Sequence, residues 1–116
     1  MTEPLLTDAY HRKAMDLVDL AQLNARGEYY GPEATDVLWL RALEHERIAA
    51  EALPLTLASE PSRSVLFRSA SCLAIRCNDY REAERLACQG LLGWPPADIA
   101  EELRECLRAA WEGMAG

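Results

Sequence analysis

Apolar residues recur at spacings of three and four along most of this 116-residue chain, with polar residues between them. That spacing places apolar side chains on one face of an α-helix. No segment shows the strict apolar–polar alternation of a half-buried strand, and β-branched residues are scarce. The pattern predicts an all-α protein with helices over residues 8–26, 32–53, 62–77, 80–92 and 97–113.

Capping signals set the expected ends of these helices. Thr7 is a good N-cap for the first helix, and Gly27 is typical of a helix end. Pro32 is favoured at the first position of the second helix. Asp79 precedes the fourth helix and is followed three residues later by Glu82, as in a capping box.

Small residues mark the surface on which the third and fourth helices are expected to meet. They are Ala70, Ala74, Ala83, Ala87 and Gly90. Glycine inside a helix costs about 1 kcal/mol relative to alanine, so Gly90 indicates that a neighbouring helix needs the space. Asn78, between the two helices, tolerates the left-handed backbone that a helix C-terminus needs. We therefore expect a closely packed helix hairpin.

Residues 64–97 have the 34-residue length of a tetratricopeptide repeat. They also resemble that repeat at its turn and at signature positions after it, which here are Asn78, Asp79, Tyr80, Ala83, Gly90 and Pro95. Two sites that are large in the family are alanine in this chain, at Ala74 and Ala87. The chain as a whole is similar to small bacterial tetratricopeptide-like proteins.

The resemblance implies one domain over residues 1–116, built as a right-handed α-α superhelix of five helices in antiparallel hairpins. Residues 8–53 would form a degenerate first hairpin with its turn at 28–31. Residues 64–97 would form the clearest repeat. Residues 97–113 would form a C-terminal capping helix.

The helix over residues 62–77 contains three arginines and no acidic residue, in a chain of net charge -7. In tetratricopeptide repeats the corresponding helix lines a concave peptide-binding groove. The resemblance therefore implies a partner-binding face comprising Val65, Arg68, Cys72, Ile75 and Arg76. An acidic peptide would complement its arginines. The alternative is that Arg68 and Arg76 pair with acids of the first hairpin. The acids available there include Asp16, Asp19 and Asp36.

Nothing in the sequence carries a catalytic or metal-binding pattern. His11 and His45 form no H-E-x-x-H or E-x-x-H motif, and no serine lies in a G-x-S-x-G elbow. The four cysteines are Cys72, Cys77, Cys88 and Cys106. They lack C-x-x-C spacing, which argues against zinc, and free cysteine is commonly a small buried apolar residue. We expect reduced cysteines, no catalytic residues, no metal and no cofactor.

The charge and hydropathy argue against nucleic acids and membranes as partners. A net charge of -7 and an isoelectric point near 4.8 disfavour binding to nucleic acids or anionic membranes. No apolar run approaches the roughly 18 residues that span a membrane, and the N-terminal segment lacks a signal-peptide pattern. We therefore expect a cytoplasmic protein.

These features favour a non-enzymatic protein–protein interaction module that binds a peptide segment or partner protein in a shallow groove. The alternative is a structural, self-assembling helical protein. A short helical array has two exposed end faces, through which such a protein would form a homodimer.

Overall fold

The computed structural model describes residues 3–29 and 31–116. All regular structure in these ranges is helical and no β-strand occurs there, which confirms the all-α prediction. The α-helices are α1 (Glu3–Ala25), α2 (Thr35–Glu51), α3 (Ser62–Arg76), α4 (Tyr80–Leu91) and α5 (Ala97–Ala115). A short 3-10 helix, η1 (Leu57–Ser59), precedes α3.

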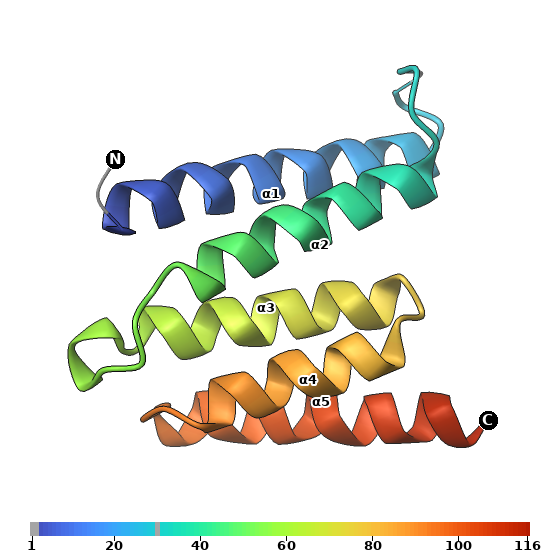
Figure 1. Cartoon of the computed structure of the whole chain (residues 1–116). Helices are drawn as coiled ribbons and strands as arrows, with labels where there is room; N and C mark the ends of the chain where they lie inside the picture. The colour runs from blue at the N-terminus through green and yellow to red at the C-terminus, as the bar shows by residue number, and fades with distance from the viewer. Residues whose placement is uncertain (1–2, 30) are drawn as a thin grey trace.

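The helices follow one another across the molecule in chain order, each running antiparallel to the one before it (Figure 1). Each α-helix packs on the next, and α3 also packs along α5. The array measures 42 × 41 × 20 Å, so it is about two helix diameters thick. α3 therefore lies at the centre of the array, in contact with α2, α4 and α5.

The first helix begins earlier than the capping signals predicted. α1 already includes Glu3, so the prediction that Thr7 is its N-cap was wrong. Thr7 is buried instead, and its hydroxyl donates a hydrogen bond of 3.0 Å to the carbonyl oxygen of Ala49 in α2. Thr7, which resembles a helix cap in the sequence, thus forms a hydrogen bond between α1 and α2.

The second helix begins later than predicted. α2 starts at Thr35 rather than at Pro32, and its N-cap position is Ala34, which offers no side-chain hydrogen bond. The turn predicted at residues 28–31 includes Tyr30, which lies outside the described residues. The predicted ends of α3, α4 and α5 differ from the observed ones by no more than two residues.

The turn between α3 and α4 has the expected conformation. Asn78 adopts a left-handed backbone with φ of 59°. The next amide, that of Asp79, donates a hydrogen bond of 2.9 Å to the carbonyl oxygen of Ala74, which closes the end of α3. The Asp79 carboxylate in turn accepts a hydrogen bond of 3.2 Å from the amide of Glu82, which confirms it as the N-cap of α4.

The small residues predicted to form a close contact between α3 and α4 are all buried. The four alanines are fully inaccessible to solvent. A Cβ atom added at Gly90 would lie 3.0 Å from Cβ of Phe67 in α3 and 2.8 Å from Cδ2 of Leu103 in α5. A side chain at Gly90 would thus meet both α3 and α5. The sequence predicted only the contact with α3.

Larger apolar side chains fill the space between the helices. The core includes Leu17, Leu38, Trp39, Phe67, Leu86 and Leu103. None of the helices in the described part of the chain is both long enough and apolar enough to cross a membrane.

Candidate partner-binding surface

The residues of the partner-binding face predicted on α3 lie against three different helices, α1, α2 and α5. Residues eight apart on a helix differ by about 80° around its axis, which is the relation of Arg68 to Arg76. Arg68 points toward α5, where it forms an ion pair with Glu102. The side chain of Arg76 packs against α2 instead, with its guanidinium carbon 4.6 Å from the centre of the Trp39 ring. The two arginines therefore do not line one groove.

A pocket of about 460 Å³, which we call the α5-side pocket, lies between α3 and α5. Its lining comprises Arg68, Cys72, Ile75, Glu102, Glu105, Cys106 and Ala109. Three of the five residues predicted from the sequence thus meet here, with side chains of α5 that were not foreseen. Because Glu102 neutralises Arg68 and Glu105 adds a second acid, the formal charge of this lining is negative, not positive.

A second pocket, of about 220 Å³, lies on the other flank of α3, toward α1, and we call it the α1-side pocket. Its lining comprises Thr7, Asp8, His11, Ser62, Val65 and Leu66. Val65, the fourth predicted residue, belongs here and is half-buried. Asp8 is exposed and is the one acidic residue of this lining.

Arg76, the fifth predicted residue, lies in a separate place at the C-terminal end of α3. It lines a shallow pocket of about 260 Å³ that includes Asp36 and Trp39 of α2. Among the described residues no acid lies within 4.0 Å of the Arg76 guanidinium, so its observed partner is the Trp39 ring. The alternative pairing with acids of the first hairpin is therefore not observed for Arg76, and Arg68 pairs with α5 instead.

A buried carboxylate joins three helices beside the α1-side pocket. Glu46 of α2 is fully inaccessible to solvent. One carboxylate oxygen lies 2.8 Å from Nδ1 of His11 in α1, and the other accepts a hydrogen bond of 2.6 Å from the hydroxyl of Ser69 in α3. Both oxygens of the buried carboxylate thus have a hydrogen-bond partner at the junction of the two hairpins.

These three side chains do not have the arrangement of a hydrolytic triad. In such a triad the histidine lies between the serine and the acid, where it can accept the serine proton. Here the acid lies between Ser69 and His11, so the imidazole is not the partner of the hydroxyl. The cluster therefore has the geometry of a structural junction.

Two cysteines face each other across the α3–α5 contact. Cys72 is exposed, whereas Cys106 is buried, and their Sγ atoms lie 3.6 Å apart. A hydrogen bond from Cys106, helped by the positive charge of Arg68, lowers the pKa of Cys72 to about 7, against the opposing effects of burial and Glu102. The same hydrogen bond, together with burial, raises the pKa of Cys106. Cys72 is thus the more acidic thiol of the pair.

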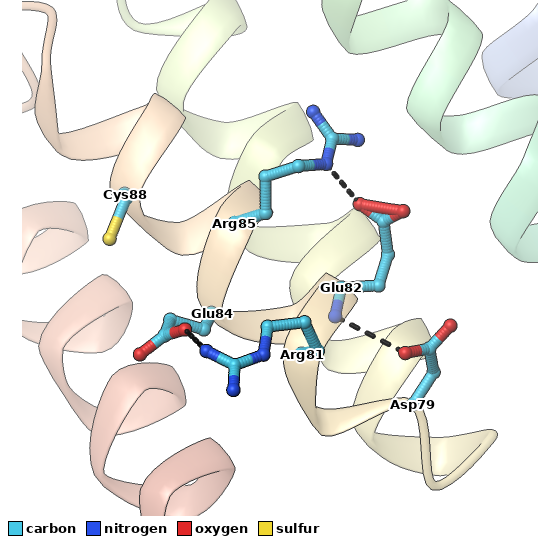
Figure 2. Close-up of a pocket in the computed structure, with 6 residues that line it drawn as sticks. All are labelled: Asp79, Arg81, Glu82, Glu84, Arg85 and Cys88. Carbon is cyan, nitrogen blue, oxygen red and sulfur yellow. Dashed lines mark hydrogen bonds and ion pairs between the residues drawn. The ribbon is translucent and has the colours of Figure 1, made fainter.

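The outward surface of α4 is charged and its charges are paired. Figure 2 shows the residues that line a pocket of about 500 Å³ there, namely Asp79, Arg81, Glu82, Glu84, Arg85 and Cys88. Arg81 pairs with Glu84 at 3.0 Å, and Arg85 pairs with Glu82. Exposed ion pairs spaced three residues apart are typical of a solvated helix surface. Apart from Cys88, the lining of this pocket offers no apolar side chain to a partner.

The sequence-based prediction missed Glu46 and Cys106. Glu46 lies four residues after Ala42 and three before Ala49, so its position on the buried stripe of α2 could have been recognised. Cys106 lies on the apolar stripe of α5, but its proximity to Cys72 depends on the packing of α5 along α3. No group of three or more metal-ligating side chains occurs in the described ranges.

No family model, no curated protein and no solved structure matches this chain. The likeness to tetratricopeptide repeats therefore rests on the residues of the α3–α4 hairpin. The superhelical arrangement, a bacterial origin and a cytoplasmic location stay predictions.

Proposed function

We propose that this protein is a tetratricopeptide-like interaction module that binds an extended segment of a partner protein across α3. The observation that carries the proposal is that two shallow pockets flank α3, one toward α1 and one toward α5. Val65 lines the first pocket, and Cys72 and Ile75 line the second. An extended peptide crossing the helix could place one side chain in each pocket, as in other peptide-recognition surfaces that use alternate side chains.

The charges around the two pockets favour a different peptide from the one expected from the arginines. Asp8, Glu102 and Glu105 outnumber Arg68, which is already paired. Opposite charges steer association and reject wrong partners. We therefore propose a segment with apolar side chains and at least one lysine or arginine, in place of the acidic peptide.

The alternative of self-assembly through the end faces has less support. The outward surface of α5 carries ion pairs from Glu101 to Arg104 at 3.4 Å and to Arg108 at 2.7 Å. On α1 the exposed residues are mostly polar and include Asp8, Arg12, Lys13, Asp16 and Asp19. Polar outer faces are typical of the terminal helices that cap a repeat array.

Selection of displayed random peptides on the immobilised protein tests the proposal, because it needs no knowledge of the natural partner. We expect the selected peptides to be basic and apolar, and their binding to shift amide resonances of residues around both pockets. Acidic peptides, or shifts confined to α4, would contradict the proposal. A failure to select peptides, together with a dimer in light scattering, would favour self-assembly.

Charge reversal sharpens this test. Glu105→Lys changes an exposed residue that lines the α5-side pocket, and we expect it to weaken peptide binding by about tenfold, equivalent to about 1.4 kcal/mol. Glu112→Lys makes the same charge change at an exposed residue of α5 outside both pockets. Equal weakening by the two variants would indicate a general charge effect and not a binding site.

A further inference from the structure

We propose that Cys72 and Cys106 form a reactive thiol pair that closes to an intramolecular disulfide by exchange with a low-molecular-weight disulfide such as glutathione disulfide. This inference goes beyond the proposed function and does not rest on it. The pair joins α3 to α5, which are separated by α4 in the chain but packed side by side.

The placement of the two sulfur atoms carries the proposal. The Sγ atoms are 3.6 Å apart, and a disulfide requires about 2.05 Å. Closing the bond therefore requires the two sulfur atoms to approach by about 1.5 Å. Cys72 is exposed at the edge of the α5-side pocket, so a small disulfide molecule can reach it. Cys106 lines the same pocket but is only 5% exposed.

The electrostatic surroundings assign different roles to the two thiols. The charged and titratable groups around the pair are Arg68 on α3 and Glu102 and Glu105 on α5. With the pKa of Cys72 lowered to about 7, a large fraction of this residue is thiolate at neutral pH. The thiolate is the nucleophile in disulfide exchange, so Cys72 attacks first. Cys106, whose Sγ lies 3.6 Å from that of Cys72, then resolves the intermediate.

The exchange is balanced in two steps. The Cys72 thiolate attacks one sulfur of glutathione disulfide, the S–S bond breaks, and the released glutathione thiolate takes up a proton. Cys106 then loses its proton to solvent and attacks Sγ of Cys72, which releases the second glutathione. Two protein thiols are oxidised to one disulfide, and one glutathione disulfide is reduced to two thiols.

The other two cysteines provide internal controls. Cys77 and Cys88 are free and, within the part of the chain that the structure describes, neither lies within hydrogen-bond distance of another sulfur. Burial, with Asp79 and Asp36 nearby, raises the pKa of Cys77. Cys88 is exposed on the outward surface of α4. Neither residue has a partner that could resolve a mixed disulfide.

The experiment uses the 116-residue chain carrying Cys77→Ser and Cys88→Ser, treated with glutathione disulfide under native conditions. We expect a product lacking two hydrogen atoms in the intact mass, and a cross-linked peptide pair containing Cys72 and Cys106. Adding Cys106→Ala should stop the reaction at a glutathione adduct on Cys72. Adding Cys72→Ala should slow all modification by at least tenfold, because the remaining thiol is buried.

Two further measurements bear on the same proposal. In the same double-serine background, the rate of alkylation should rise with pH through a midpoint near 7, and Cys106→Ala should move that midpoint upward. The disulfide should also raise the melting temperature by roughly 10 °C, since it closes a long loop in the unfolded chain. The proposal would be overturned by a stable glutathione adduct on the variant in which Cys72 and Cys106 are both unsubstituted. It would also be overturned by a disulfide that forms only in denaturant.

Discussion

The two hairpins, α1–α2 and α3–α4, differ in what lies between their helices. Both bring their backbones close together with alanine, which is fully buried at Ala14 and Ala42 in the first hairpin and at Ala74 and Ala83 in the second. The first hairpin, however, also buries the carboxylate of Glu46. The second has a further small residue, Gly90, where Phe67 of α3 approaches α4.

The difference shows that two kinds of interaction position α3. On its α2 side the contact depends on a polar group that must keep its hydrogen-bond partners, His11 and Ser69. On its α4 side the contact depends on shape, because Gly90 leaves room for Phe67 and Leu103. A polar contact fails when a partner is lost, and a contact based on shape fails when volume is added.

The largest expected effect is that of Glu46→Ala. Removing the carboxylate leaves a cavity and deprives the Ser69 hydroxyl of its acceptor, so we expect a loss of about 2–3 kcal/mol of unfolding free energy in denaturant melts. The loss stays below that of a fully buried ion pair because the His11 side chain is 44% exposed.

Glu44→Ala is the matched control for this variant. Glu44 is on the same helix but exposed, where it pairs with Arg47. We expect a change within about 0.5 kcal/mol for this control. Equal effects of the two substitutions would show that Glu46 does not hold the two hairpins together.

Gly90→Leu should have the next largest effect. Overpacking against Phe67 and Leu103 should cost about 1–3 kcal/mol, and the gain in helix propensity of about 1 kcal/mol offsets only part of it. Cys88→Leu adds the same side chain at an exposed position of α4 and should be nearly neutral. A stabilised Gly90→Leu variant would contradict the close contact.

The caps of the two hairpins should give the smallest effects, with opposite signs. Asp79→Ala removes the hydrogen bond from the Glu82 amide and should lower the free energy of unfolding by about 1 kcal/mol.

Ala34, the uncapped N-cap of α2, has an extended backbone with φ of -67° and ψ of 156°, which suits a serine cap. Ala34→Ser should therefore add about 0.5–1 kcal/mol, and denaturant melts that show a loss would indicate that the serine does not cap α2.

Local rules in the sequence predicted the second half of the molecule well. The limits of α3, α4 and α5, the left-handed Asn78 and the Asp79 cap all follow from backbone preferences and from hydrogen bonds between near neighbours. The buried position of Gly90 followed from the cost of glycine in a helix. The start of α1 was missed because Thr7 forms its hydrogen bond with another helix, which no local rule describes.

The candidate site was determined by tertiary structure. The helical period specifies the angle of each side chain around its own axis, so Val65, Arg68, Cys72 and Ile75 could be grouped from the sequence. The period does not specify which neighbouring helix occupies each side of α3. Packing of α5 along α3 placed Glu102 against Arg68 and Cys106 against Cys72, and packing of α2 placed Trp39 under Arg76. These contacts decide the charge of the surface and the reactivity of its thiol, because both depend on groups distant in the chain.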